Sequence, residues 1–133
     1  MPFQRAIDAG ADSIMTAHVV YEDIDPEYPA TISKKIMTGL LRDTMHFDGI
    51  AVTDCMEMDA IRAHYGTGEG AVRALEAGCD LLTFSHTYDA VSKAANAIYE
   101  AIDSGRLSVR GILRPCPSLQ GEVRPHVRPC SQH

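Results

Sequence analysis

The fold of this chain is decided by the stretch Gly49-Ile-Ala-Val-Thr-Asp54-Cys-Met-Glu-Met-Asp-Ala60. A short apolar run between a glycine and a polar break is typical of a strand buried on both faces, as in parallel sheets. The run ends in the polar pair Thr53-Asp54, and a helical segment follows almost at once. Catalytic groups of α/β folds stand at the carboxyl ends of such strands. An aspartate in that place can instead cap the next helix, so position alone leaves both roles of Asp54 open.

The same pattern recurs on both sides of this stretch. Residues 6–18 and 74–86 match at a constant offset of 68, and each reads as a helix, a glycine stop, a strand and a polar tip. The pattern predicts strands near residues 13–17, 49–53 and 80–85. Strands that alternate with longer helices form right-handed βαβ units with a parallel sheet. We therefore expect an α/β fold with His18, Asp54 and His86 at one edge of the sheet.

Helical periodicity fills the intervals between these strands. A short helix over residues 3–7 ends at Gly10, and a second runs from Thr31 or Ser33 to about His46. A third spans residues 58–65. The glycine-rich segment 66–70, which resembles a phosphate loop only loosely, is expected to break the pattern before a helix over 71–78. The last helix, from 89 to 105, has an expected buried stripe of Val91, Ala94, Ala95, Ile98 and Ile102.

The aspartates that begin two of the strands belong to the opposite edge of the sheet. Asp12 and Asp80 precede their strands, and a strand of about five residues puts them roughly 15 to 17 Å from the tips. Residues on that face ordinarily stabilise the fold. We expect neither residue to act together with Asp54.

Composition and charge narrow the classes of function. The 133 residues suit one soluble domain, and the net charge of −6 argues against a nucleic-acid surface. No apolar run is long enough to span a membrane. Residues 109–133 carry four arginines against one acid, a balance of +3, so residues 1–108 carry −9. We expect 1–108 to form the folded domain and the proline-rich segment 109–133 to be a disordered tail.

The four cysteines predict neither a disulfide framework nor a metal site. Cys55 and Cys79 lie in the apolar part and Cys116 and Cys130 in the tail, at spacings that fit no zinc template. A reducing compartment, and hence a cytoplasmic location, is expected. We expect no cofactor and no metal. Cys55 is interpreted as a packing residue because no base is placed to activate it.

Three segments together resemble a known family. They are Ala9-Gly-Ala-Asp-Ser-Ile-Met-Thr-Ala-His18, Pro29-Ala-Thr-Ile-Ser-Lys-Lys-Ile-Met-Thr-Gly-Leu-Leu-Arg42 and Phe47-Asp-Gly-Ile-Ala-Val-Thr-Asp54-Cys-Met-Glu-Met58. They resemble family 3 glycoside hydrolases, in particular the bacterial β-N-acetylhexosaminidases, over residues 1–108. The resemblance implies a partial (β/α)8 barrel of about three βα units, since a full TIM barrel takes about 250 residues. It also implies a carbohydrate substrate of the N-acetylglucosaminide type.

The same resemblance assigns roles to single residues. It implies that Asp54 is the nucleophile of a retaining mechanism, which forms a glycosyl-enzyme intermediate. It places His18 near the sugar site and Met58 beneath a sugar subsite, so both are expected to bind substrate. The acid/base of the resembled branch comes from a Lys-His-Phe-Pro-Gly-His-Gly type loop, expected upstream of Phe3 and absent from the 133 residues. Glu57 is close to Asp54, but a loop or cap role is favoured for it. We therefore expect the chain alone to be inactive.

Two alternative hypotheses stay open at this point. His18, Asp54 and His86 could converge as the ligands of a metal-dependent barrel hydrolase. A non-catalytic half-barrel could instead associate with itself through its open sheet edges.

Overall fold

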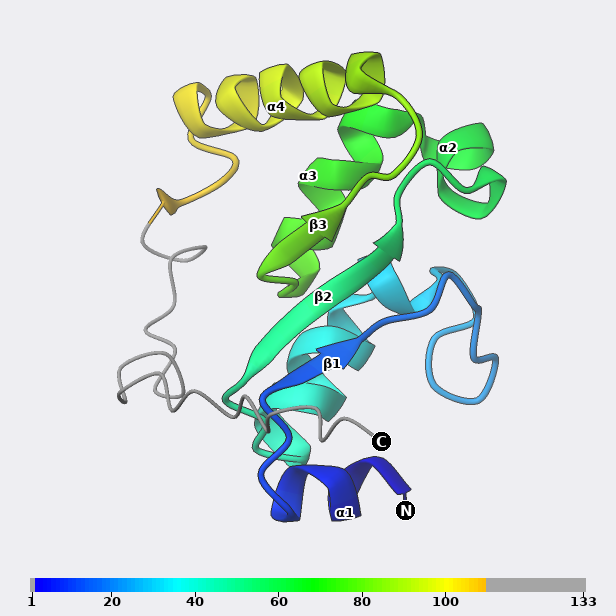
Figure 1. The fold of residues 1–133 in the computed structure, drawn as a ribbon, viewed down its shortest axis with the longest axis vertical. Coiled ribbons are helices and arrows are strands. Elements are labelled where there is room, and N and C mark those ends of the chain that lie inside the picture. Colours follow the sequence, from blue (N-terminus) through cyan, green and yellow to red (C-terminus); the bar gives the residue numbers. More distant parts are fainter. Residues whose placement is uncertain (1, 110–133) are drawn as a thin grey trace, which may run out of the picture.

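The computed structural model describes residues 2–109. The elements in chain order are α1 (Pro2–Asp8), β1 (Ser13–Met15), the 3-10 turn η1 (Ala30–Ile32), the π-helix η2 (Lys35–Thr44), β2 (Ile50–Cys55), α2 (Asp59–Tyr65), α3 (Thr67–Ala77), β3 (Leu81–Thr83) and α4 (Tyr88–Asp103). Figure 1 shows the three strands pointing in the same direction, with α1 at one end of the molecule and α4 at the other. The predicted tail 109–133 lies, except for Val109, outside the described residues.

The sheet is parallel with the strand order β1-β2-β3, so the stretch that decides the fold forms its central strand. Met15 of β1 stands opposite Val52 of β2, and Val52 stands opposite Leu81 of β3. All three predicted strands and the α/β class are confirmed. The first and third strands are shorter than predicted, and the central strand extends two residues further, to Cys55.

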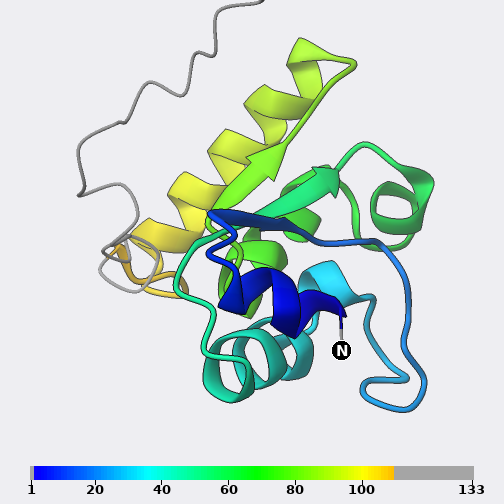
Figure 2. The same ribbon diagram turned by 60° about the horizontal axis from the view of Figure 1, so that its bottom comes forward.

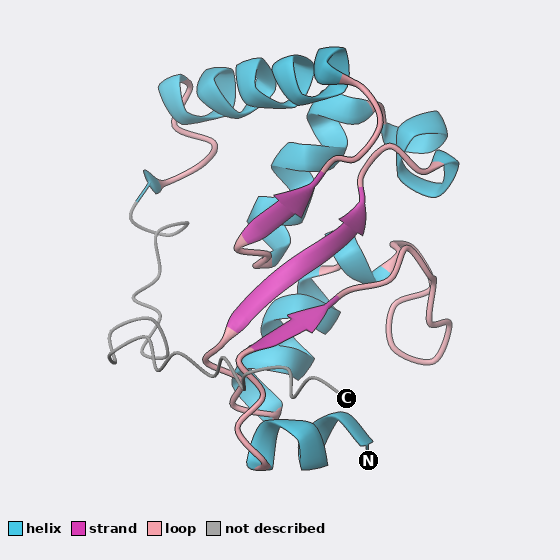
Figure 3. Cartoon of the chain, in the orientation of Figure 1, coloured by secondary structure: helices cyan, strands magenta, loops and turns pink. Residues whose placement is uncertain are grey.

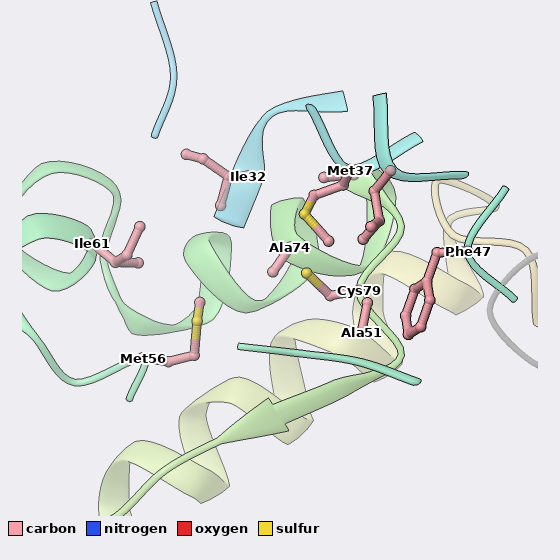
Figure 4. Packing of buried hydrophobic residues seen from close by; sticks show 10 residues of the cluster. Ile32, Met37, Phe47, Ala51, Met56, Ile61, Ala74 and Cys79 are labelled. Atoms are coloured by element: carbon pink, nitrogen blue, oxygen red, sulfur yellow. The ribbon is translucent and has the colours of Figure 1, made fainter. Parts of the chain in front are cut away.

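Two helices, η2 and α3, lie behind the strands in Figure 3, and the turned view in Figure 2 shows both on the same side of the sheet. On that face Ala51 and Thr53 of β2 are fully buried. The core joins β2 to the helices and consists mainly of Ile32, Met37, Phe47, Ala51, Met56, Ile61, Ala74 and Cys79 (Figure 4). On the other face the apolar row of Met15 and Leu81 stays 63% and 55% exposed. The described part of the chain therefore has a core on one side of its sheet and an open face on the other.

The loop and glycine between η2 and β2 are fixed by close packing. His46 has a φ of +56° and ends η2 where a stop was predicted. A Cβ atom on Gly49 would lie 2.5 Å from the carbonyl oxygen of Asp12 and 2.6 Å from the ring of Phe47. At the start of the central strand, the backbone of Gly49 therefore lies directly against the backbone of Asp12, just before β1, and against the buried ring of Phe47.

The expected break at residues 66–70 is confirmed only at Gly66, whose φ of +75° separates α2 from α3, and its extension to residue 70 is wrong. Helix α3 begins at Thr67 and includes Gly68 and Gly70. These glycines serve helix packing, since a Cβ on Gly68 would lie 2.8 Å from Ala97 of α4 and a Cβ on Gly70 2.6 Å from Ile61 of α2. Only a hydrogen atom fits at these two positions, so the close approach of α3 to α2 and α4 requires glycine at both.

Two further details of the helices differ from the sequence prediction. Val91 was expected in the buried stripe of α4, but it is 42% exposed, and the buried positions are Ala90, Ala94 and Ala101. The stripe is rotated by one residue because α4 presents its small side chains to α3. The segment 35–44 is a π-helix, and we have no physical account of why the chain widens there.

An ion pair closes the end of the sheet opposite the strand tips. Arg42 of η2 has a side chain that is 4% exposed and lies 2.5 Å from the carboxylate of Asp80. The same guanidinium donates to the carbonyl oxygens of Phe47 and Gly49 at 2.8 and 2.7 Å, and the Asp80 carboxylate also accepts from Ala51 N–H at 2.7 Å. Asp80 thus joins the start of β3 to η2 and β2, as its predicted stabilising role requires.

Among residues 2–109, the structure contains no helix that combines the length and the apolarity needed to cross a membrane.

Candidate active site

Asp54 was predicted to follow the central strand, but it is the fifth residue of β2, which continues to Cys55. Its side chain is partly buried, and the neighbouring Cys55 N–H donates to its Oδ1 at 2.7 Å. This is the single hydrogen bond that the described residues make to the Asp54 carboxylate. A partly exposed carboxylate oxygen at the carboxyl end of a parallel strand is placed where barrel enzymes hold their reacting groups.

His18 links the chain after β1 to the end of β2. Its Nε2 lies 2.9 Å from the carbonyl oxygen of Cys55, and its Nδ1 lies 2.8 Å from the hydroxyl of Thr31. The hydroxyl of Thr31 is also 2.9 Å from that of Thr16, and both threonines are buried. His18 is therefore bonded to the residue that follows Asp54, at the carboxyl end of β2, with both ring nitrogens engaged inside the protein. That it binds substrate stays a prediction.

Glu57 binds the loop that follows β3. Its Oε2 accepts from the backbone N–H groups of Ser85 and His86 at 2.9 and 2.7 Å. Its Oε1 accepts from the N–H and the hydroxyl of Thr87 at 2.9 and 2.7 Å. Thr87 is the residue before α4, so the carboxylate also faces the positive end of that helix. Glu57 fixes the β3–α4 loop, and the favoured loop or cap role is confirmed.

These bonds keep the Glu57 carboxylate ionised. The hydroxyl of Thr87, followed by the N–H of His86 and then those of Ser85 and Thr87, lowers the pKa of Glu57 from 4.5 to about 2. Hydrogen bonds to the charged form favour it. A carboxylate with this pKa carries no proton at neutral pH, so Glu57 is unsuited to donate one to a leaving group.

The end of β2 is also held in place through Cys55, and Met58 lies in the turn that follows it. Cys55 Sγ lies 3.0 Å from the hydroxyl of Ser85 and 3.9 Å from Glu57 Oε2. The Glu57 carboxylate, with a pKa of about 2, is too weak a base to activate this thiol, which agrees with the interpretation of Cys55 as a packing residue. Met58 begins the turn into α2 and is 46% exposed, in contrast to Met56, which is fully buried. Met58 therefore offers apolar surface near Asp54.

The metal hypothesis for His18, Asp54 and His86 is wrong for this geometry. Within residues 2–109, no group of three His, Cys, Asp or Glu side chains is placed to hold a metal ion. Both nitrogens of His18 are already hydrogen-bonded, to a carbonyl and to a hydroxyl. The ring has no free lone pair to offer, because a nitrogen that donates to a carbonyl carries a proton. Cys116 and Cys130, whose spacing predicted no zinc site, lie outside the described residues.

Sequence reasoning missed the partners that hold this site together. Thr31, Ser85 and Thr87 bind His18, Cys55 and Glu57, respectively, and Thr16 binds Thr31. Of these four, the sequence pointed only to Thr31, and only as a possible start of a helix. Each lies far along the chain from its partner, for example 30 residues between Glu57 and Thr87. The one available signal was the Ser-His-Thr sequence after β3, whose short polar side chains are typical of a loop before a helix.

Similar proteins share both the sequence and the fold. Residues 1–114 match the glycosyl hydrolase family 3 N-terminal domain. A β-hexosaminidase of Nitrosomonas eutropha is 35% identical over 109 residues, which are 80% of this chain and 31% of that protein. A β-hexosaminidase of Xylella fastidiosa is 38% identical over 123 residues, 85% of this chain and 36% of that protein.

A solved structure resembles the chain closely. The family 3 β-N-acetylglucosaminidase of Paenibacillus sp. strain FPU-7 superposes with a TM-score of 0.81 at 48% sequence identity, and the match covers 84% of this chain and 21% of that one. The predicted partial barrel is confirmed by this likeness. The chain spans about a third of the length of the curated relatives that it matches.

Proposed function

The chain belongs to glycosyl hydrolase family 3, and from this premise we propose that it carries the nucleophile of a retaining β-N-acetylhexosaminidase-like site. Asp54 is the attacking carboxylate. It stands in the Phe-x-Gly-x-x-x-Thr-Asp-x-x-x-Met element that the chain shares with this family. The substrate is a carbohydrate with an N-acetylglucosaminide-like sugar, as the names of its relatives suggest.

The observation that carries this proposal is the placing of the Asp54 carboxylate. Oδ1 is oriented by the N–H of Cys55 at 2.7 Å, and the group is partly exposed at the open end of the strand. A carboxylate held by one backbone donor keeps an oxygen free to attack an anomeric carbon and form a glycosyl ester. Met58, 46% exposed just beyond the strand, supplies apolar surface for the sugar ring.

The second half of the chemistry comes from outside the described residues. A retaining mechanism needs an acid/base group to protonate the leaving oxygen, which typically contributes about 10² to 10⁴-fold in rate. Glu57 cannot supply this proton because its pKa is about 2 and both oxygens bind the β3–α4 loop. We therefore propose that the 133 residues alone do not hydrolyse β-N-acetylglucosaminides at a useful rate.

Self-association of the isolated chain is proposed from its open sheet face. Among the described residues β1 and β3 each pair on one side only, and Met15 and Leu81 are more than half exposed. Unpaired strand edges and exposed apolar rows favour association with other chains. Sedimentation of the 133-residue chain over a range of concentrations tests this, and a monomer at all concentrations contradicts it.

The catalytic role is tested in a chimera. Residues 1–108 of this chain replace the matching region of the Nitrosomonas eutropha β-hexosaminidase, and hydrolysis of a chromogenic N-acetylglucosaminide is measured. We expect the chimera to be active, Asp54→Ala to abolish turnover and Asp12→Ala, at the opposite edge of the sheet, to leave it nearly unchanged. An active Asp54→Ala chimera contradicts the proposal, and so does rapid hydrolysis by the isolated 133-residue chain.

A further inference from the structure

We infer that His18 is a positioning residue that orients the Asp54 carboxylate through the backbone of Cys55. The inference rests on the proposed function, in which Asp54 is the nucleophile. Two hydrogen bonds in series carry it: His18 Nε2 to the carbonyl oxygen of Cys55 at 2.9 Å, and Cys55 N–H to Asp54 Oδ1 at 2.7 Å. The N–H and the C=O of Cys55 are thus held at the same time, one by the nucleophile and one by the ring.

The partners of the ring fix the tautomer of the neutral imidazole. A carbonyl oxygen only accepts, so Nε2 of His18 carries the proton. In a neutral imidazole Nδ1 then accepts, and the hydroxyl of Thr31 at 2.8 Å is its donor. Two acceptors compete for the single proton of the Thr31 hydroxyl, Nδ1 of His18 at 2.8 Å and the carbonyl oxygen of Ala17 at 3.2 Å, and the shorter contact assigns the proton to Nδ1. Thr16 then donates to Thr31 across their 2.9 Å contact. His18 is therefore the last member of a chain of donors that starts in the buried part of the protein.

This chain is rigid where it meets the core. The exposed fractions of Thr16 and Thr31 are 6% and 0%. Buried hydrogen-bonded groups of this kind are costly to displace, because each lost partner leaves a polar atom unsatisfied. The position of His18, and with it the carbonyl of Cys55, is set by the interior of the protein and does not depend on substrate.

Cys55 is anchored on its other side as well. Its Sγ lies 3.0 Å from the hydroxyl of Ser85, in the loop that Glu57 holds. Contacts from both neighbouring strands therefore converge on the residue that follows the nucleophile. If the ring of His18 is removed, the carbonyl of Cys55 keeps only the N–H of Met58 at 3.1 Å as a donor, and the Cys55 N–H is freer to rotate away from Oδ1. A small displacement of a reacting group costs on the order of 10²-fold in rate.

The geometry is tested first in the full 133-residue chain by nuclear magnetic resonance. Nitrogen-15 shifts of the ring give the tautomer of His18, and hydrogen exchange gives the protection of the Cys55 amide. We expect the Nε2–H tautomer and a protected amide. His18→Ala raises the exchange rate of that amide about tenfold, whereas His18→Gln, which keeps a side-chain N–H donor, restores most of the protection. His64→Ala, at an exposed histidine of α2, is the matched control and changes nothing at Cys55.

Three results overturn the inference. They are a proton on Nδ1 with none on Nε2, equal exchange of the Cys55 amide in the wild type and His18→Ala, and no difference between the Gln and Ala variants. Should His18→Ala fail to fold, Thr31→Val removes the hydroxyl partner with little change in shape. Wild-type protection at Cys55 in that variant counts against the donor chain, and weaker protection supports it.

The consequence for catalysis is measured in the chimera described above. We expect His18→Ala to lower kcat on the order of 10²-fold while KM changes little, because the ring orients the nucleophile and leaves sugar binding in place. Full activity of His18→Ala beside an inactive Asp54→Ala overturns this inference alone. An active Asp54→Ala overturns the proposed function instead, so the two failures are distinguishable.

Discussion

Glu57 and Thr87 are joined by two hydrogen bonds, because the backbone N–H of Thr87 donates to Glu57 Oε1 at 2.9 Å and its hydroxyl donates to the same oxygen at 2.7 Å. The contact ties the turn after β2 to the start of α4, across 30 residues of sequence. Together with the His18–Cys55 bond, it holds the segment next to Asp54 from both sides.

Removing the Glu57 carboxylate should loosen the β3–α4 loop. In Glu57→Ala the N–H groups of Ser85, His86 and Thr87 lose their shared acceptor, so their amide hydrogens should exchange faster, while amides in the core of α3 stay protected. Glu57→Gln keeps one acceptor oxygen, so its amide exchange rates in this loop should lie between those of the wild type and of Glu57→Ala. Hydrogen exchange measured residue by residue checks this, and unchanged protection in Glu57→Ala would contradict the role of the carboxylate.

Stability should fall in acid through two carboxylates. The Thr87 hydroxyl lowers the pKa of Glu57, and Arg106 lowers that of Glu69, each from 4.5 to about 2. A carboxyl whose pKa is lower in the folded state binds protons more strongly when unfolded. Its contribution is therefore complete above about pH 4.5 and is lost as the pH falls toward 2.

Urea unfolding at a series of pH values measures this loss. Glu57→Gln and Glu69→Gln should each reduce the slope of the unfolding free energy between pH 4.5 and 2. Glu100→Gln, at an exposed position of α4, is the control and should keep the wild-type slope. A wild-type slope in both test variants would mean that neither carboxylate is bound as the structure has it.

The glycines of α3 should resist enlargement while a glycine of η2 should accept it. Gly70→Ala places a methyl group against Ile61 and should cost about 1 to 3 kcal/mol of stability. In Gly39→Ala the new methyl group would lie 4.0 Å from the carbonyl oxygen of Lys34, an ordinary contact distance, so the change should be neutral or stabilising by up to about 1 kcal/mol. Thermal unfolding of the two variants decides, and an equally stable Gly70→Ala would show that α3 and α2 are not in this contact.

The two aspartates that precede strands should differ sharply in importance. Asp80→Ala leaves the buried guanidinium of Arg42 without its counter-charge and should cost about 3 kcal/mol. Asp12→Ala, at the repeat-related position before β1, removes an exposed side chain and should cost less than about 0.5 kcal/mol. Chemical denaturation compares them, and similar losses would argue against the Arg42 network.

Much of this fold could be predicted because its signals are local. Each strand is a short apolar run after a glycine, so the three strands and their common direction follow from a repeated pattern in the sequence. Asp54 could be found in the same way, as the polar end of the central run. The start of α3 could not, since glycines read as breakers and the need for close contact with Ile61 and Ala97 has no signal in nearby residues.

The supports of the site are non-local, and this is why they escaped prediction. The bond from His18 to Cys55 spans 37 residues and those from Glu57 to the β3–α4 loop span 28 to 30. Such pairs are brought together only when parallel strands align their carboxyl ends. The resemblance to family 3 placed His18 near the sugar site, whereas the geometry points to its action through Cys55.

The cytoplasmic location stays a prediction.

The central claim, that Asp54 is the nucleophile, is tested most directly by trapping the glycosyl-enzyme intermediate. The chimera that contains residues 1–108 is treated with a fluorinated sugar that forms a slowly hydrolysed ester, digested and analysed by mass spectrometry. The account predicts that the mass of one sugar residue is added to the peptide that contains Asp54, and that Asp54→Ala takes up none. A label on any other carboxylate, Glu57 included, would contradict it.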